Sequence, residues 1–351
     1  MASASHPPRE TTGTGARDAF GPRFRCAPAP TWNLGSRALD VSRPVVMGIL
    51  NLTPDSFSDG GRYGTLEAAL GRAAEMVNEG AAILDVGGES TRPGATPVSP
   101  DEEAERILPF LEAASGRFDV PLSVDTRRAS VARAALEAGS EIVNDVSALA
   151  HDPAMAATVA ESGKAVVLMH MRGTPATMGG LARYDEVIVE VAQELEAALA
   201  RASGAGIERD RIALDPGIGF AKDGAHNLTL LRNLGSLGRL GRPLMVGPSR
   251  KRFIGEITGR EPRERVHGTV AACVMAYLEG ARIFRVHDVS PVVQALAVTR
   301  AIVEEGNEGP PDPAAGGADG PGAENGPERD AGAATERGSD GRAGRRVERT
   351  E

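Results

Sequence analysis

Eight short apolar runs recur through the middle of the chain, and segments with helical spacing separate them. The runs are almost continuously apolar instead of alternating, which is typical of parallel strands buried on both faces. Strands alternating with helices indicate an α/β fold with right-handed crossovers, and eight rounds favour a closed (β/α)8 (TIM) barrel over an open doubly wound sheet. The predicted strands are residues 45–51, 82–88, 121–126, 141–146, 165–171, 211–217, 243–249 and 281–288.

Six segments, five between these runs and one after the last run, carry the marks of helices. Residues 65–80 repeat apolar side chains at helical spacing, and residues 101–116 open with acidic side chains, which suit a helix N-terminus. Residues 130–139 and 264–280 end on glycine, a common helix stop. The predicted helices are residues 65–80, 101–116, 130–139, 185–202, 264–280 and 292–305.

The two ends of the chain differ in composition from the middle. Residues 306–351 contain 11 glycines and 5 prolines, and Val347 is their only large apolar residue. Such a segment buries too little apolar surface to offset the entropy of ordering it, so we expect a disordered tail. Residues 1–24 are interpreted in the same way. The predicted domain is therefore residues 25–305, close to the roughly 250 residues of one barrel.

Composition and charge exclude several classes of protein. The net charge of −9 argues against a general binder of nucleic acid or of anionic membranes, which needs a basic face. Two distant cysteines, Cys26 and Cys273, make neither a disulfide scaffold nor a zinc module, and they favour a cytoplasmic location. We find no apolar run long enough for a membrane span, no secretory signal, no P-loop and no GxGxxG after a strand.

Polar or charged residues end one predicted strand after another. For any single strand, a helix cap or a loop hydrogen bond is an adequate explanation. In a (β/α)8 barrel, however, the carboxyl ends of all strands converge on the face that holds active sites. The set mixes carboxylates, amides, imidazoles and cations, which suits a pocket for a polar heterocycle plus an anion. Its members are Asn51, Glu89, Asp125, Asn144, Asp145, His170, Asp215, Ser249, Arg285 and His287.

Seven short motifs at these strand ends resemble those of the dihydropteroate synthase family. The resemblance runs from about Asn33 to Glu304 and implies a (β/α)8 barrel. It implies condensation of 6-hydroxymethyl-7,8-dihydropterin diphosphate with p-aminobenzoate, with release of diphosphate. It also implies dependence on Mg²⁺, a homodimer and inhibition by sulfonamides. The motifs are NLTPDSFSDGG (51–61), DVGGESTRPGA (85–95), SVDT (123–126), NDVS (144–147), DPGIGF (215–220), SRK (249–251) and RVHD (285–288).

The resemblance assigns roles to individual residues of this chain. The expected catalytic residues are Asp125, Lys251, Arg285 and Asn51, and Asn51 is also the expected Mg²⁺ ligand. The pterin is expected against Asp125, Asn144, Asp215, Lys251 and Arg285, and the diphosphate against Asn51, Thr91, Arg92, Arg285 and His287. For p-aminobenzoate the expected contacts are Phe57, Thr91, Pro93, Phe220 and Lys251.

These residue types suit the chemistry. A carboxylate accepts two N–H groups from the edge of a pterin, an amide can meet a donor and an acceptor together, and a guanidinium stacks on the ring. The family mechanism resembles SN1: diphosphate leaves first, and the amine then attacks a cationic pterin methylene. Such an enzyme needs no nucleophile of its own, and it must stabilise the separating charges and exclude water. Asp85 and Glu89 are interpreted as supporting acids.

Two departures from the family pattern and two rival interpretations remain at this stage. Arg252 follows SRK where the family often has serine, and we predict that its side chain or backbone N–H contacts the p-aminobenzoate carboxylate. Ala221–Asp223 replace a common Gly-Lys-Thr. The rivals are a methyltetrahydrofolate–corrinoid methyltransferase, which would share the pterin acids, and a catalytically silent pterin-binding paralogue.

Overall fold

The computed structural model describes residues 30–53, 61–90 and 97–304. The predicted tails lie outside these ranges, as do four predicted site residues, namely Phe57, Thr91, Arg92 and Pro93. None of the helices that the structure describes is long and apolar enough to cross a membrane.

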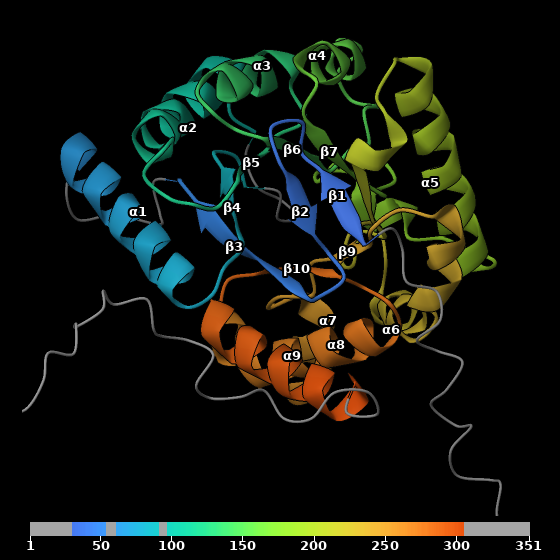
Figure 1. Ribbon diagram of the computed structural model, residues 1–351. Coiled ribbons are helices and arrows are strands. Elements are labelled where there is room, and N and C mark those ends of the chain that lie inside the picture. Colours follow the sequence, from blue (N-terminus) through green and yellow to red (C-terminus); the bar gives the residue numbers. More distant parts are fainter. Residues whose placement is uncertain (1–29, 54–60, 91–96, 305–351) are drawn as a thin grey trace, which may run out of the picture. The chain divides into compact units, whose positions relative to one another are not determined.

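Eight parallel strands of the described chain form one sheet in the order β8-β7-β6-β5-β4-β3-β10-β9. The Leu214 N–H donates to the Pro243 carbonyl oxygen at 2.9 Å, and Leu214 and Leu244 form a parallel bridge, so the two edges meet. Helices surround the closed sheet (Figure 1), and the predicted (β/α)8 barrel is confirmed. The strands are β3 (Val45–Asn51), β4 (Ile83–Gly87), β5 (Leu122–Asp125), β6 (Ile142–Asp145), β7 (Ala165–Met169), β8 (Ile212–Asp215), β9 (Met245–Val246) and β10 (Ile283–Val286).

Each predicted helix is present, with its limits shifted by a few residues, and three short helices were not predicted. The second helix illustrates why the limits fall where they do: Ser99 accepts a hydrogen bond from the Glu102 N–H, and Pro100 occupies the first helical position. The helices are α1 (Gly61–Asn78), α2 (Pro100–Ala114), α3 (Ala129–Glu137), α4 (Met155–Ser162), α5 (Val187–Gly204), α6 (Gly224–Arg232), α7 (Arg252–Thr258), α8 (Val266–Leu278) and α9 (Val289–Glu304). Those not predicted are α4, α6 and α7.

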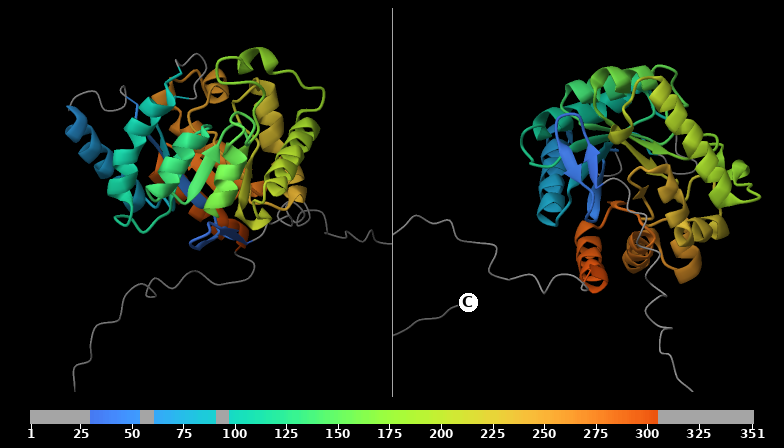
Figure 2. Two further views of the ribbon diagram at one scale, coloured as in Figure 1. Left: turned by 90° about the horizontal axis from the view of Figure 1, so that it is seen from above. Right: turned by 45° about the vertical axis from the view of Figure 1, so that its right-hand side comes forward.

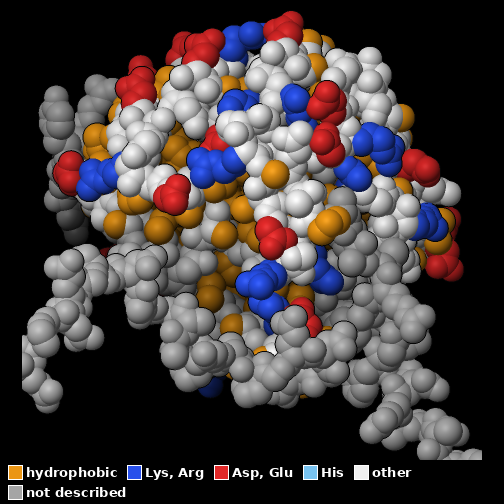
Figure 3. Space-filling model, viewed as in Figure 1, with side chains coloured by type: hydrophobic (Ala, Val, Ile, Leu, Met, Phe, Trp, Pro, Cys, Tyr) orange, Lys and Arg blue, Asp and Glu red, His pale blue; other side chains and the backbone are white. Residues whose placement is uncertain are grey.

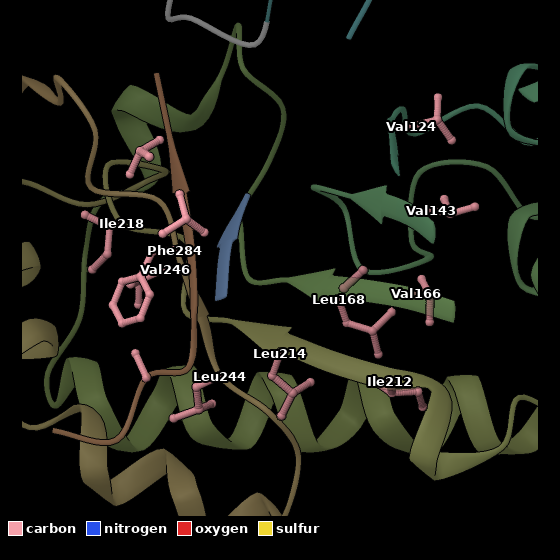
Figure 4. Close-up of a cluster of buried hydrophobic side chains, with 14 of the residues drawn as sticks. Val124, Val143, Val166, Leu168, Ile212, Leu214, Ile218, Leu244, Val246 and Phe284 are labelled. Atoms are coloured by element: carbon pink, nitrogen blue, oxygen red, sulfur yellow. The ribbon is translucent and has the colours of Figure 1, made fainter. Parts of the chain in front are cut away.

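The main apolar core lies between the outer face of the barrel and the helices. Outward-facing side chains of neighbouring strands, such as Val124, Val143 and Val166, are fully buried in it (Figure 4). Because both faces of the sheet are covered, the strands are the near-continuous apolar runs that the sequence shows.

A small antiparallel hairpin, which the sequence analysis did not predict, closes one end of the barrel. Its strands are β1 (Thr31–Asn33) and β2 (Ala38–Asp40), and Figure 2 shows it at one end of the barrel. Trp32 of this hairpin is fully buried in a second apolar cluster, made with the inward-facing residues that begin the strands. Because this cluster fills it, the inside of the barrel is apolar at the hairpin end. On the outer surface of the same end, Figure 3 shows acidic and basic side chains interspersed over the described residues.

Candidate active site

Asp85, Asn144 and Arg285, three polar residues near the strand ends, face into the barrel because of the two-residue period of a β-strand. Ile83, Ile142 and Ile283 belong to the apolar cluster inside the barrel. Two residues further along the same strands, on the same face, are Asp85, Asn144 and Arg285. The interior thus changes from apolar to polar within one step of the alternation. The polar end lies at the carboxyl ends of the strands, where barrel enzymes carry their active sites.

A small pocket opens at this end of the barrel. Six of the predicted site residues line it together: Asp125, Asn144, Asp215, Phe220, Lys251 and Arg285. The rest of its wall is mostly apolar and is made by Val146, Met169, Ile218, Met245 and Gly247. This combination, an apolar wall with a few convergent polar groups, is typical of a site for a small organic molecule.

Two oxygen atoms of the pocket residues stand out among the described residues. Asp125 Oδ1 and Asn144 Oδ1 are buried and have no hydrogen-bond partner. An unpaired buried acceptor is costly, on the order of 1–3 kcal/mol, and native structures contain few of them. They lie side by side on neighbouring strands β5 and β6, where donors of water or of a ligand would satisfy them.

Arg285 is held between two carboxylates. Its Nε donates to Asp85 Oδ2 at 2.5 Å, and a terminal nitrogen donates to Asp125 Oδ2 at 2.7 Å. Burial lowers the pKa of Arg285, but the charges of Asp85 and Asp125 outweigh burial and raise it above its ordinary value. Burial is also the main cause that raises the pKa of Asp125 to about 7 and that of Asp215 to about 6. The pocket therefore holds carboxyl groups that exchange protons near neutral pH.

The DPGIGF segment (residues 215–220) forms part of the pocket wall, and its path requires glycine at two positions. Gly217 and Gly219 have φ angles of +70° and +82°, which L side chains rarely adopt. A Cβ on Gly217 would lie 2.0 Å from the carbonyl oxygen of His170, and one on Gly219 would lie 2.9 Å from Lys251 Cδ. These close approaches bring Lys251 over the ring of Phe220, with Nζ 4.0 Å from the ring centroid.

A buried lysine behind this wall supports it. Lys222 Nζ donates to the Phe220 carbonyl oxygen and lies near His170 Nδ1, each at 2.9 Å. The opposite nitrogen of His170 lies 3.0 Å from Glu194, which also pairs with Arg172. Burial lowers the pKa of Lys222 to about 7. His170 and Arg172 belong to this network, and neither residue is among those that line the described pocket.

Asn51 and His287 lie at the rim of the polar end. Asn51 ends β3, and Gly87 of β4 separates it from Asp125: a Cβ on Gly87 would lie 3.7 Å from Asn51 Oδ1 and 3.6 Å from Asp125 Cβ. His287 follows β10, and its Nδ1 lies 3.0 Å from Ser249 Oγ. Asn51 and His287 thus lie at the carboxyl ends of two neighbouring strands, β3 and β10, and neither is among the residues that line the described pocket.

Arg252 takes a different position from the other predicted residues. It is the first residue of α7, its side chain is 91% exposed, and its Nε donates to Glu256 Oε1 at 2.7 Å. It is not among the residues that line the described pocket. Its contact with p-aminobenzoate stays a prediction.

Asp85 is the residue to which the sequence analysis gave too small a role. It is fully buried and accepts hydrogen bonds from Ser123, Asn144 and Arg285. The sequence contained a signal for this burial, because Asp85 lies on the same strand face as Ile83 and interrupts an otherwise apolar run. A charged residue at an inward position of a buried strand needs polar partners from other strands.

Comparisons with known proteins identify the family of the chain. The family model described as pterin binding enzyme matches residues 47–287. Dihydropteroate synthase of Synechocystis sp. is 50% identical over 261 residues, which are 74% of this chain and 90% of that protein. Dihydropteroate synthase of Escherichia coli is 47% identical over 75% of this chain and 93% of that protein.

Solved structures give the same result. A Xanthomonas albilineans dihydropteroate synthase with 4-aminobenzoic acid superposes with a TM-score of 0.74 at 47% identity, over 78% of this chain and 98% of that one. A Yersinia pestis dihydropteroate synthase in complex with a sulfonamide drug has a TM-score of 0.73 at 44% identity, over 76% and 97% of the two chains.

A closed barrel whose polar end presents buried carboxylates, an amide and cations to a small pocket defines a pterin-binding barrel enzyme. Within that class, the chain belongs to the dihydropteroate synthase family, the transferases of folate biosynthesis.

Proposed function

We propose that this enzyme joins 6-hydroxymethyl-7,8-dihydropterin diphosphate to p-aminobenzoate, forming 7,8-dihydropteroate and diphosphate. The observation that carries the proposal is the pair of unpartnered acceptors, Asp125 Oδ1 and Asn144 Oδ1, in the wall of the pocket. A pterin edge offers an amino group beside ring N–H groups, so it supplies adjacent donors to adjacent acceptors. Lys251 donates to ring acceptors, Asp215 accepts a further N–H, and the planar guanidinium of Arg285 stacks on the ring.

In the reaction, the bond between the pterin methylene carbon and the diphosphate oxygen breaks first. The bonding electrons leave with the diphosphate, and a cationic methylene remains. The carboxylates of Asp85 and Asp125 lie in the buried end of the barrel, where fixed negative charge stabilises that cation more strongly than water does. The neutral amine of p-aminobenzoate then forms the C–N bond, and its nitrogen loses a proton to the surroundings.

The leaving diphosphate is assigned to the carboxyl ends of the neighbouring strands β3 and β10. Asn51, Arg285 and His287 supply an amide, a guanidinium and an imidazole there. Thr91 and Arg92, which the family resemblance adds, lie outside the described residues. Binding of the diphosphate by Arg285 and His287 stabilises negative charge that grows as the C–O bond breaks, and so lowers the barrier.

Mg²⁺ is assigned to the same strand ends. Within the described residues, no three or more His, Cys, Asp or Glu side chains are grouped so that they could hold a metal ion, but the amide oxygen of Asn51 is a suitable hard ligand. Mg²⁺ in phosphate sites commonly takes one or two protein oxygens and completes its shell with water and phosphate oxygens. When bound, Mg²⁺ would neutralise part of the diphosphate charge.

Removal of divalent cations with EDTA is expected to abolish product formation, and added Mg²⁺ is expected to restore it. Asn51→Ala should raise the Mg²⁺ concentration needed for half-maximal activity, because one ligand is lost. Binding of a pterin without diphosphate serves as the control, since it needs no metal. Full activity in EDTA would contradict the metal assignment.

The p-aminobenzoate ring is assigned to the side of the pocket where Lys251 lies over Phe220. Phe57, Thr91 and Pro93 complete this subsite in the family and lie outside the described residues. An aromatic face and a nearby cation suit an aromatic carboxylate, since the ring packs on Phe220 and the cation attracts its charge.

Arg252→Ala is expected to raise the KM for p-aminobenzoate severalfold while the KM for the pterin diphosphate stays constant. The reason is that loss of a cation within reach of the carboxylate weakens one substrate only. Glu256→Gln, which frees Arg252 from its ion pair, should lower the same KM. An unchanged KM in Arg252→Ala would refute a side-chain contact and leave the backbone N–H as the remaining possibility.

The enzyme is proposed to act as a homodimer through α8 and α9. These two helices pack on each other, and Met275, Val298 and Ile302 are 46%, 61% and 71% exposed in the single chain. Light scattering is expected to give twice the 36.4 kDa mass of the chain, and Val298→Asp with Ile302→Asp is expected to give the monomer mass, because each charge disfavours burial. A monomer mass for the unaltered protein would refute the dimer.

A cytoplasmic location is proposed for the same enzyme. Its two cysteines are too few for a disulfide framework, which suits a reducing compartment. Fractionation of cells that make the protein tests this assignment.

Product formation tests the function as a whole. Purified protein is mixed with Mg²⁺, the pterin diphosphate and labelled p-aminobenzoate, and labelled dihydropteroate and free diphosphate are measured in equal amounts. Binding of the pterin diphosphate without product would instead support the silent paralogue. The corrinoid methyltransferase predicts neither product, and the relatives and structures above do not favour it.

A further inference from the structure

Asp85 connects three other strands of the barrel at the floor of the pocket. It lies on β4 and is fully buried. Its Oδ1 accepts a hydrogen bond from Ser123 Oγ of β5 at 2.6 Å, and its Oδ2 accepts from Asn144 Nδ2 of β6 at 3.1 Å and from Arg285 Nε of β10 at 2.5 Å. Asp85 is not among the residues that line the described pocket, so its hydrogen bonds reach a ligand only through these neighbours.

The hydrogen bond to Asn144 decides which way its amide faces. A carboxylate only accepts hydrogen bonds, whereas an amide has a donating nitrogen and an accepting oxygen. Asp85 therefore attracts Nδ2 of Asn144, and the oxygen of the amide turns the other way. That oxygen is the buried Asn144 Oδ1 that has no partner in the described protein.

The hydrogen bond between Asp85 and Arg285 likewise determines which oxygen of Asp125 is occupied. With Nε of Arg285 on Asp85, a terminal nitrogen of the guanidinium donates to Asp125 Oδ2 at 2.7 Å. One oxygen of Asp125 is thus occupied, and the other, Oδ1, is left without a partner. A single buried carboxylate accordingly orients both groups that carry the free acceptors.

We propose that Asp85 is a positioning residue that makes the pterin edge of the pocket accept hydrogen bonds at two adjacent points. This inference rests on the proposed function, since it specifies how the site selects the amino-substituted edge of its substrate. The pocket then discriminates between a pterin, whose C2 carries an amino group, and a lumazine, whose C2 carries a carbonyl oxygen. The carbonyl oxygen would face an acceptor and leave it unpaired.

Asp85→Asn tests the inference, because the side chain keeps its shape and gains a donor. Its amide can donate to Asn144 Oδ1, so the Asn144 amide is free to turn and present Nδ2 to the ligand. Affinities for 6-hydroxymethylpterin and for 6-hydroxymethyllumazine are measured by calorimetry on the full-length protein. The preference for the pterin is expected to be at least about tenfold in the unaltered protein and to shrink by about tenfold in Asp85→Asn, the cost of one mispaired group.

The double variant Asp85→Asn with Asn144→Asp separates orientation from general damage. The exchange places a donor at position 85 against a carboxylate at position 144, so an acceptor again faces the pocket. The hydrogen bond from Arg285 Nε to this atom of residue 85 is lost in the single and the double variant alike, so it does not distinguish them. Recovery of the preference for the pterin is expected. Ser123→Ala is the matched control, because it removes a hydrogen bond to Asp85 without changing which atom Asn144 presents, and it should keep the preference.

The outcomes distinguish this inference from the proposed function. An Asp85→Asn variant that is folded by circular dichroism and keeps the full preference, or loses affinity for both ligands equally, would overturn the inference alone. If that variant does not fold, the double variant decides by itself, and absence of a pterin preference there overturns the inference. An unaltered protein that binds neither ligand would refute the proposed function itself.

Discussion

Replacement of Asp125 with asparagine is expected to lower kcat/KM for dihydropteroate formation by about 100- to 1000-fold, because loss of one preorganised electrostatic contact to the developing charge raises the barrier by about 2.7–4 kcal/mol. The substitution leaves Arg285 with one carboxylate instead of two. It also replaces part of the accepting surface that faces the pterin with a donor. Steady-state rates with labelled p-aminobenzoate measure the loss.

The matched control is Asp119→Asn, the same chemical change at an exposed position. It should leave the rate unchanged. Circular dichroism shows whether each variant is folded, so that a loss of rate in Asp125→Asn is assigned to the site. Nearly full activity in a folded Asp125→Asn protein would remove Asp125 from the pterin site.

The pH dependence of pterin binding provides a second measurement of the same residue. Burial raises the pKa of Asp125 to about 7, so below that pH a proton occupies the group that must accept from the pterin. Affinity should therefore rise with pH and level off above about 7, by up to about tenfold per unit. In Asp125→Asn this rise is lost, and the lower step from Asp215, whose pKa is about 6, remains.

Trp32→Ala is expected to lower the stability of the barrel by about 3–5 kcal/mol, the usual cost of truncating a fully buried tryptophan. Trp32 is fully buried, and its Nε1 donates to the Arg211 carbonyl oxygen at 3.0 Å. The side chain closes the apolar end of the barrel, so its loss opens a cavity against the first residues of the strands. Thermal unfolding followed by circular dichroism should show Tm lowered by about 10 °C.

Activity at low temperature separates this effect from damage to the site. The hairpin lies at the end of the barrel opposite the pocket, so Trp32→Ala should keep its kcat where it is still folded. Trp32→Phe, which fills more of the cavity, should unfold between the alanine variant and the unaltered protein. A Tm equal to that of the unaltered protein in Trp32→Ala would show that the hairpin does not contribute to the core.

Local patterns were sufficient to predict the barrel. Strands buried on both faces are apolar along their whole length, and this property is visible in residues 45–51 without knowledge of their neighbours.

The prediction of strands was less accurate where the local pattern was short or interrupted. The expected strand 243–249 pairs over two residues only, Met245 and Val246, and Pro248, which has no N–H, limits its extension. The hairpin was missed because strands of three residues carry too little pattern to be detected.

The sequence by itself determined which residue types stand at the carboxyl ends of the strands, and therefore the class of ligand, because chain order and the two-residue period are local properties. Only the tertiary structure decided how those residues pair. Asp85 and Arg285 are 200 positions apart, and they meet because β3 pairs with both β4 and β10 in the closed sheet. The same closure orients Asn144 and leaves two acceptors unpaired, while it leaves Arg252 in solvent. Hydrogen-bond direction depends on three-dimensional neighbours, and no spacing along the chain encodes it.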